Sequence, residues 1–325
     1  MILLVSHPGD DHLAPVQSAL DRMGAGWVAV DTSEIPTSLA ISAEHGPYDR
    51  RRITLAGGDE IDLDACRVGW WRRPLPPVLD ERITDPHEYT FAVTEVHEAL
   101  AGFWNGLPLT WVSPPRVVET TMMKTWQLPA ARRAGLRVPR TLITSNPRHA
   151  RRFIDEVGLG NVICKAFSAQ PERWRETRMV RHEEYELLDR VALAPVIFQE
   201  FVPAEVDLRV TIVGDEIFPA AIHSQELPYA LDFRLHLDEV RMEPATLPDA
   251  VADGLRGLLR AAGLRYGAVD LRRTPAGDHV FLEINPAGQW LFVEEKTGQP
   301  MTEAMARLLA GLHEEDVHDD GTRRD

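Results

Sequence analysis

The hydrophobic pattern of residues 1–113 alternates between strands and helices. Apolar residues recur at helical spacing over 13–23 and again over 88–107. Short apolar runs with the length of buried strands occur at 2–6, 27–30, 51–55 and 68–71. Strands that alternate with helices predict an open α/β layer.

The pattern changes after Ser113-Pro114-Pro115, where two prolines interrupt the chain. A helix over 118–134 is expected next, ended by Gly135. A small αβ unit follows, whose helix and two strands are expected at 148–157, 162–165 and 196–201. The segment 168–178 is polar and lacks periodicity, and it therefore predicts a loop.

Two hairpins dominate the rest of the chain. Their strands are expected at 207–213, 216–223, 266–273 and 279–285, and helices at 247–262 and 301–312. The stretch 314–325 is charged and has one large apolar side chain, which predicts a flexible, frayed acidic tail. We expect an α/β fold, α+β in its C-terminal part, with domains at 1–113, 114–202 and 203–313.

Length and charge exclude several classes of protein. A chain of 325 residues exceeds the size of one growing core, so two or three subdomains are expected. The formal charge of −15 argues against a nucleic-acid partner. No apolar run approaches the roughly 20 residues of a membrane span. Two cysteines, Cys66 and Cys164, give neither a disulfide framework nor a zinc pattern, so we expect a cytoplasmic protein.

Lysine is rare in this sequence. Of 35 lysines and arginines, only Lys124, Lys165 and Lys296 are lysine. A compact ammonium and a planar guanidinium are not interchangeable at a tight phosphate site. We therefore expect Lys124 and Lys165 to bind phosphate, and Lys296 to lie on a solvated face.

The second hairpin carries candidate metal ligands. Glu283 and Asn285 stand two apart on one strand, so their side chains share a face, and Asp270 lies on the partner strand. Two carboxylates and an amide suit Mg²⁺. A hairpin loop at 274–278 would pair Asp270 with Leu282 and not with Glu283. Bringing the three ligands together therefore requires a one-residue bulge, which we place at Gly277. A polar outer face of an ordinary amphipathic hairpin explains the same residues equally well.

The order of motifs resembles the ATP-grasp superfamily, in the branch that includes the ligase adding glutamate to a ribosomal protein. The similarity extends from about residue 115 to residue 310. It rests on Lys124, Lys165, Gln199-Glu-Phe-Val-Pro203, Asp207-Leu-Arg209, Leu231-Asp-Phe-Arg234 and the second hairpin.

The resemblance implies a pre-ATP-grasp domain at 1–113, a lid at 114–202 and a catalytic part at 203–313, with ATP and Mg²⁺ as cofactors. Lys124 and Lys165 match lysines that bind ATP phosphates. The adenine-binding linker corresponds to Gln199, Glu200, Phe201 and Val202, and the ribose-binding acid to Asp207. Arg209 and Arg234 match arginines that face the phosphates or the acyl phosphate. The magnesium ligands correspond to Asp270, Glu283 and Asn285. One departure is that the loop after Lys165 contains no glycine over 166–181.

A narrower resemblance involves Gly69-Trp-Trp-Arg72-Arg-Pro74 and the segments 223–248 and 283–294. They are similar to the microviridin-type graspetide macrocyclases. Such enzymes activate Asp or Glu side chains of a ribosomal precursor peptide as acyl phosphates, and they form ester or amide cross-links within that peptide. The implied partner is a precursor peptide with a leader segment, and a homodimer is compatible with it. We expect substrate contacts at Arg72, Tyr229, Phe233, Leu235 and Gln289 and leader docking on 226–248, whereas Trp70 is expected in a domain interface.

Three alternatives remain. One is an amino-acid or glutamate ligase that acts on a protein tail or a small molecule. A second is a peptide-binding protein with an inactive nucleotide fold, which predicts lost lysines and metal ligands. The third is a zinc deacetylase built on Ser6-His-Pro-Gly-Asp-Asp-His12, although no His-x-x-His completes its ligand set. The competing explanation for this segment is a helix-start loop capped by Asp10 or Asp11.

Overall fold

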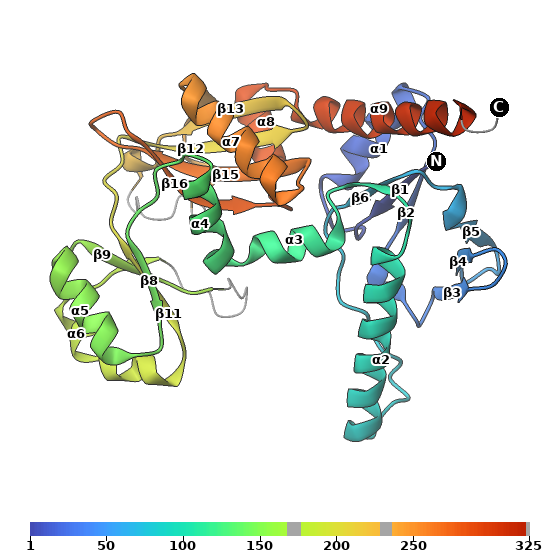
Figure 1. Cartoon of the computed structure of the whole chain (residues 1–325), viewed down its shortest axis with the longest axis horizontal. Coiled ribbons are helices and arrows are strands. Elements are labelled where there is room, and N and C mark those ends of the chain that lie inside the picture. Colours follow the sequence, from blue (N-terminus) through green and yellow to red (C-terminus); the bar gives the residue numbers. More distant parts are fainter. Residues whose placement is uncertain (168–176, 228–235, 323–325) are drawn as a thin grey trace.

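A computed structural model describes residues 1–167, 177–227 and 236–322, with the side chains of the last helix described as far as Glu315. In these ranges the strands form four sheets. Three of them follow one another along the chain, and Figure 1 shows a separate lobe around the middle one. The expected boundaries near residues 113 and 202 fall between consecutive sheets.

The N-terminal sheet is parallel, as the alternating pattern predicts. Its strand order is β2-β1-β6-β7, and α1 (Leu13–Arg22) and α2 (Pro86–Asn105) accompany it. The strands are β1 (Ile2–Val5), β2 (Trp27–Val30), β6 (Val68–Trp71) and β7 (Thr110–Val112). Every residue of β1 is buried. The first apolar run is therefore a central strand.

The run near residue 51 does form a strand, β4 (Arg50–Thr54), but in a different sheet. It pairs antiparallel with β3 (Ala40–Glu44) and β5 (Glu60–Asp62). Ile53 is the one fully buried residue of β4. A strand in the middle of a parallel sheet is buried on both faces, and this composition cannot meet that requirement.

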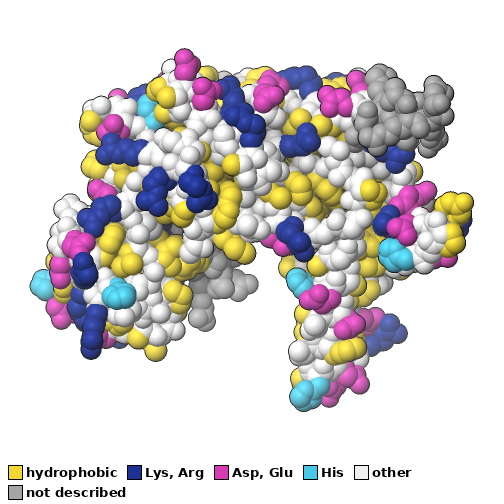
Figure 2. All heavy atoms as spheres, viewed as in Figure 1, with side chains coloured by type: hydrophobic (Ala, Val, Ile, Leu, Met, Phe, Trp, Pro, Cys, Tyr) yellow, Lys and Arg dark blue, Asp and Glu magenta, His cyan; other side chains and the backbone are white. Residues whose placement is uncertain are grey.

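The central sheet is antiparallel, with the order β10-β9-β11-β8. Its strands are β8 (Thr141–Thr144), β9 (Val162–Lys165), β10 (Arg178–Met179) and β11 (Val196–Glu200). Helix α5 (Pro147–Val157) covers it through Phe153 and Ile154, and α6 (His182–Glu186) lies on the same lobe. Figure 2 shows a broad hollow between this lobe and the projecting helix α2.

The C-terminal sheet contains both predicted hairpins, in the order β14-β13-β12-β15-β16. Its strands are β12 (Val206–Val213), β13 (Glu216–Ile222), β14 (Met242–Pro244), β15 (Tyr266–Arg273) and β16 (His279–Asn285). Helix α7 (Asp249–Ala262) packs against it, and α8 (Leu291–Thr297) and α9 (Met301–Thr322) follow. Within the described ranges, no helix has the length and apolar character needed to cross a membrane.

The predicted helix over 118–134 is wrong in one respect, because two helices stand there. Helix α3 (Pro115–Met122) ends at Met123, whose extended backbone (ψ 114°) starts α4 (Lys124–Arg133). The break lets α4 turn into the core beneath the C-terminal sheet, through Ala130 and Ala131. The predicted frayed tail also needs correction, since α9 continues to Thr322. Each residue added to an existing helix gains a hydrogen bond at little further cost, so a charged sequence can extend it.

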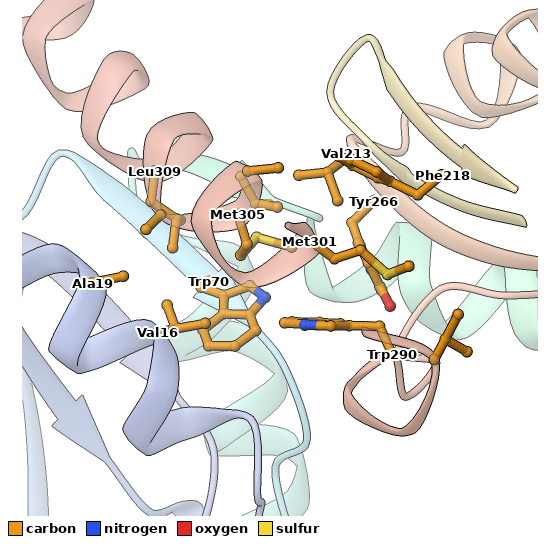
Figure 3. Close-up of a cluster of buried hydrophobic side chains, with 14 of the residues drawn as sticks. Val16, Ala19, Trp70, Val213, Phe218, Tyr266, Trp290, Met301, Met305 and Leu309 are labelled. Atoms are coloured by element: carbon orange, nitrogen blue, oxygen red, sulfur yellow. The ribbon is translucent and has the colours of Figure 1, made fainter. Parts of the chain in front are cut away.

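Helix α9 joins the two ends of the chain. It packs on α1 and β6 of the N-terminal part and on β12 of the C-terminal sheet. Figure 3 shows Trp70 and Trp290 next to each other between α1 and α9, and their ring centroids are 6.0 Å apart. The expected interface role of Trp70 is confirmed, because this side chain is 1% exposed within the shared core.

Candidate active site

The β15–β16 hairpin places the candidate metal ligands on one face of the sheet. Asp270 pairs directly with Glu283, and the register then shifts so that Leu271 faces Phe281. The bulge therefore lies at Leu282. Our placement at Gly277 is wrong, because that glycine uses its positive φ of 85° to close the turn, where its N–H donates to Thr274 O.

Each candidate carboxylate has a cation beside it. The Asp270 carboxylate accepts a hydrogen bond of 2.9 Å from Nη1 of Arg209, and Glu283 forms an ion pair with Lys124. Asn285 is exposed, and its Oδ1 accepts from the backbone N–H of Ala287. Two carboxylates and one amide oxygen on one face are a donor set that fits a hard divalent cation such as Mg²⁺.

Lys124 occupies the first position of α4. A cation there is unfavourable, because the N-terminus of a helix carries a partial positive charge. The neighbouring carboxylate of Glu283 compensates for it. The combined positive potential of the ammonium and the helix end is a suitable site for a phosphate group.

Lys165 ends β9 and approaches the same place from the central sheet. Burial lowers the pKa of its ammonium to about 8. The charge of Glu283 opposes this shift, whereas Lys124 and Arg272 add to it. Lys165 is therefore close enough to the hairpin for the charges of Glu283 and Lys124 to act on its ammonium.

The expected adenine-binding linker leads from the central sheet to β12. The Gln199 side chain is buried and donates to Thr141 Oγ1, and the Glu200 carboxylate accepts from the N–H of Arg140. Both side chains therefore hold the linker in place, and the backbone N–H groups of Glu200 and Phe201 are engaged as well, with Arg140 O and Asn161 O.

Arg272, on β15, holds the last two residues of the linker in place. The guanidinium of Arg272 lies 6.0 Å from the centre of the Phe201 ring, and its Nη1 donates to Val202 O. Asp207, the expected ribose ligand, accepts a hydrogen bond of 2.7 Å from Arg272 Nε and another from Ser224. A ribose hydroxyl at this carboxylate has to share it with these two donors.

The turn after β16 brings Arg209 and the loop backbone together. Arg209 is 7% exposed, and its Nη2 donates to Gln289 O. Tyr266 Oη donates to Gly288 O at 2.6 Å, and burial raises the pKa of this phenol to about 12. A methyl group on Gly288 would lie 2.4 Å from Ala268 Cβ, so only glycine fits at this point.

Residues of the N-terminal domain hold the same loop, which the sequence reasoning missed. Arg72 Nη1 donates to the carbonyls of Ala287 and Gly288, and its Nε donates to Asp10. At 1% exposure, Arg72 lies between two domains, and this position does not support the predicted substrate contact. The guanidinium also lies 5.0 Å from the Trp290 ring centre, so the two motifs of the narrower resemblance meet here.

His12 completes this contact. Its Nε2 accepts from the N–H of Trp290 at 2.9 Å, so Nδ1 carries the proton and donates to Asp10. Burial raises the pKa of Asp10, but hydrogen bonds from His12 and Ser6 and the charge of Arg72 outweigh it and hold that pKa below its ordinary value. The feature of the sequence that could have indicated this contact is the pair of Asp10 and His12, which stands shortly after the first strand.

This network also bears on the zinc alternative. Asp10 and His12 are engaged inside the protein, and the described ranges contain no group of three His, Cys, Asp or Glu side chains placed to hold a metal ion. The expected capping carboxylate is also corrected, because the N-cap of α1 is His12 and has no side-chain cap.

Several candidate residues are not brought into this site. Gln289 is exposed on the loop, and only its carbonyl contacts Arg209. In the expected docking surface 226–248, the described side chains of Glu226 and Arg241 form an ion pair of 2.8 Å. Lys296 is exposed, as expected of a solvated face, and donates to the carbonyls of Asp238 and Val240. Four of the candidate residues lie outside the described ranges, namely Tyr229, Phe233, Arg234 and Leu235.

Comparison with known families gives a match at the N-terminus. The profile of the MvdD pre-ATP-grasp domain matches residues 1–119. No curated protein matches the chain significantly.

Solved structures match almost the whole chain. The macrocyclase MdnC from Microcystis aeruginosa MRC, bound with the precursor peptide MdnA, is 29% identical, with a TM-score of 0.85 over 96% of this chain and 99% of that chain. The ATP-grasp ligase PsnB, complexed with a minimal precursor, Mg and ADP, is 25% identical, with a TM-score of 0.79 over 96% of each chain. A RiPP-associated ATP-grasp ligase of Chryseobacterium gregarium, in complex with ADP and a leader and core peptide, is 24% identical, with a TM-score of 0.86 over 95% of this chain and 96% of that chain.

Proposed function

Because this chain is an ADP-forming ATP-grasp ligase of the RiPP macrocyclase family, we propose that it cross-links a ribosomal precursor peptide through Asp or Glu side chains. The observation that supports this most strongly is the meeting of Lys124, Lys165 and Arg209 with the Asp270–Glu283 pair. None of the lysines or metal ligands expected from the motif order is lost, as an inactive nucleotide fold would require.

In this proposal, ATP and Mg²⁺ are the cofactors. Asp270, Glu283 and Asn285 would hold Mg²⁺, which neutralises phosphate charge when bound. Lys124 and Lys165 bind the phosphates from two sides, and the backbone of the linker 199–202 binds the adenine, with Asp207 at the ribose. Arg209 is held by Asp270 and Gln289 O, so its guanidinium is fixed before substrates arrive.

The chemistry then follows in two steps. A carboxylate oxygen of the precursor attacks the terminal phosphorus of ATP, the bond to ADP breaks, and an acyl phosphate forms. A Ser or Thr hydroxyl or a Lys amine of the same peptide attacks the acyl carbon, loses its proton, and inorganic phosphate leaves. The product is an ester or an amide. Arg209 and Arg234 are our candidates for stabilising the charge on the transferred group.

Substrate recognition has to reach far from the reacting atoms. A long flexible peptide is positioned at low cost only if remote contacts supply binding energy. We assign leader binding to 226–248, between β13 and α7. The residues for which we infer substrate contact are Tyr229, Phe233, Leu235 and Gln289.

The test uses the purified chain with candidate precursors encoded beside its gene. We expect an ATP-dependent mass loss of one water per cross-link, together with ADP release. Removing the leader should stop cyclisation, and adding it as a separate peptide should restore part of it. Equal cyclisation without the leader would refute the docking assignment alone. ADP release with free amino acids and no water loss on any precursor would instead support the amino-acid ligase.

A further inference from the structure

Gln127 lies on α4, one helical turn after Lys124, and is 1% exposed. Its amide Nε2 donates to Ile284 O at 2.8 Å, and its Oε1 accepts from the Ile284 N–H at 3.2 Å. The same Nε2 donates to Thr121 O, at the end of α3, at 2.8 Å. One side chain thus makes three hydrogen bonds to the backbone of two other segments.

The side-chain amide makes the two hydrogen bonds to the Ile284 backbone that a neighbouring strand would otherwise make. β16 is the last strand of its sheet, and its outer edge pairs near Val280 with a single bridge to Arg137, whereas at Ile284 it faces α4. Ile284 is 2% exposed, and its N–H and C=O on that edge would lack partners without the amide. A buried, unpaired peptide group is costly. Gln127 therefore holds the N–H and the C=O of Ile284, which belong to two consecutive peptide groups, in one orientation.

The location of Ile284 gives the contact its significance. Ile284 stands between Glu283 and Asn285, the candidate metal ligands, whose side chains emerge on the opposite face of the strand from its own. A shift of the Ile284 backbone moves both ligands together. Lys124, one turn earlier on α4, contacts Glu283 itself. Two neighbouring turns of α4 thus contact two neighbouring residues of β16.

We infer that Gln127 is a positioning residue that sets the spacing between the phosphate-binding lysine and the metal-binding strand, and so couples nucleotide binding to metal binding. This inference rests on the proposed function and extends it to a residue outside the ligand set. A residue that merely satisfies a buried strand edge would stabilise the fold without changing affinity for metal at temperatures where the protein is folded.

The sharpest variant is Gln127→Glu, because it has nearly the same shape. Its carboxylate would face the carbonyl oxygens of Thr121 and Ile284 with no hydrogen to donate. Protonation restores one donor, which can bond to Ile284 O while the other oxygen accepts from the Ile284 N–H. The effect of this substitution should therefore weaken as pH falls and the carboxyl protonates.

The measurement is Mn²⁺ binding in the presence of ADP, followed by electron paramagnetic resonance. At about pH 8 we expect Gln127→Glu to bind Mn²⁺ more weakly than the wild type by about tenfold or more, the range seen when residues that orient metal ligands are changed. At about pH 5.5 the affinity of the variant is again compared with that of the wild type at the same pH, and the ratio between them should shrink.

Two further variants complete the test. Gln127→Met keeps the volume and adds no charge, so it should weaken Mn²⁺ binding by a ratio that does not depend on pH. Gln17→Glu, the same change on α1 in the N-terminal domain, should leave binding unchanged. If folded Gln127→Met binds Mn²⁺ as the wild type does, or if the Gln127→Glu ratio is constant with pH, the inference is overturned. Failure of the wild type itself to bind Mn²⁺ with ADP would instead overturn the proposed function.

Discussion

Gly288→Ala tests how tightly the turn after β16 is fixed. The added methyl group would lie 2.4 Å from Ala268 Cβ, 2.9 Å from Arg209 Nη2 and 3.2 Å from Asn285 O. Ala268 is fully buried on β15, which is paired on both sides, so this neighbour cannot yield easily. The loop has to move outward instead, which stretches the hydrogen bonds that Gly288 O accepts from Arg72 and Tyr266.

The magnitude follows from these contacts. Overpacking a well-packed site costs about 1–3 kcal/mol, and weakening two buried hydrogen bonds adds about 1–2 kcal/mol. We therefore expect a loss of roughly 2–5 kcal/mol. A chain of this size has an unfolding entropy of roughly 0.7 kcal/mol per kelvin, so the thermal midpoint should fall by about 3–7 °C.

The control is Gly311→Ala in α9, where the methyl group meets nothing within 4 Å. Alanine is a better helix former than glycine, so this change should raise stability by about 0.5–1 kcal/mol. Scanning calorimetry measures both variants, and Mn²⁺ binding reports on the displaced ligands. A midpoint for Gly288→Ala equal to that of Gly311→Ala would refute the packing argument.

The remaining predictions concern the charged residues of the site. Glu283→Gln should abolish ADP formation with little change in thermal midpoint, because it removes one anionic ligand, and near-normal ADP release would remove Glu283 from the site. Lys165→Arg should lower ATP turnover substantially, whereas Lys296→Arg, whose ammonium binds two backbone carbonyls elsewhere, should be nearly silent; identical behaviour would contradict the argument from lysine scarcity. Since burial lowers the pKa of Lys165 to about 8 and phosphate binds the ammonium form, ADP affinity should be full below that pH and fall as pH rises through it. Calorimetric titration measures this fall, which Lys165→Met should lack, and a flat profile in the wild type would contradict the role of the ammonium.

Local pattern was sufficient for the elements of this fold. The strand at β1, the helix α5 and both hairpins of the C-terminal sheet lie where apolar periodicity and turn residues indicated. Such signals are local, because a strand or helix buries its apolar face with a period that the sequence itself displays. The order of the motifs was likewise enough to predict the superfamily and the macrocyclase family, and the comparisons confirm both.

Other features depended on which surfaces meet. The break at Met123 is invisible in the pattern, because both helices are apolar on one side, and both pack on the core of the C-terminal sheet, α3 through Val117 and α4 through Ala130 and Ala131. The need for a bulge was deduced from strand pairing, but its position at Leu282 was not. Nothing in a hairpin read by itself distinguishes that position from Gly277.

The contacts between distant segments were decided by the tertiary structure alone. Arg72 and His12 bind a loop more than 200 residues away, and Gln127 pairs with the backbone of Ile284. Their partners are main-chain atoms, which every residue has, so no sequence motif records them. The sequence determined which side chains supply the charges of this site, whereas their spacing depends on how the separate layers pack, because packing alone brings main-chain atoms within hydrogen-bond distance of these side chains.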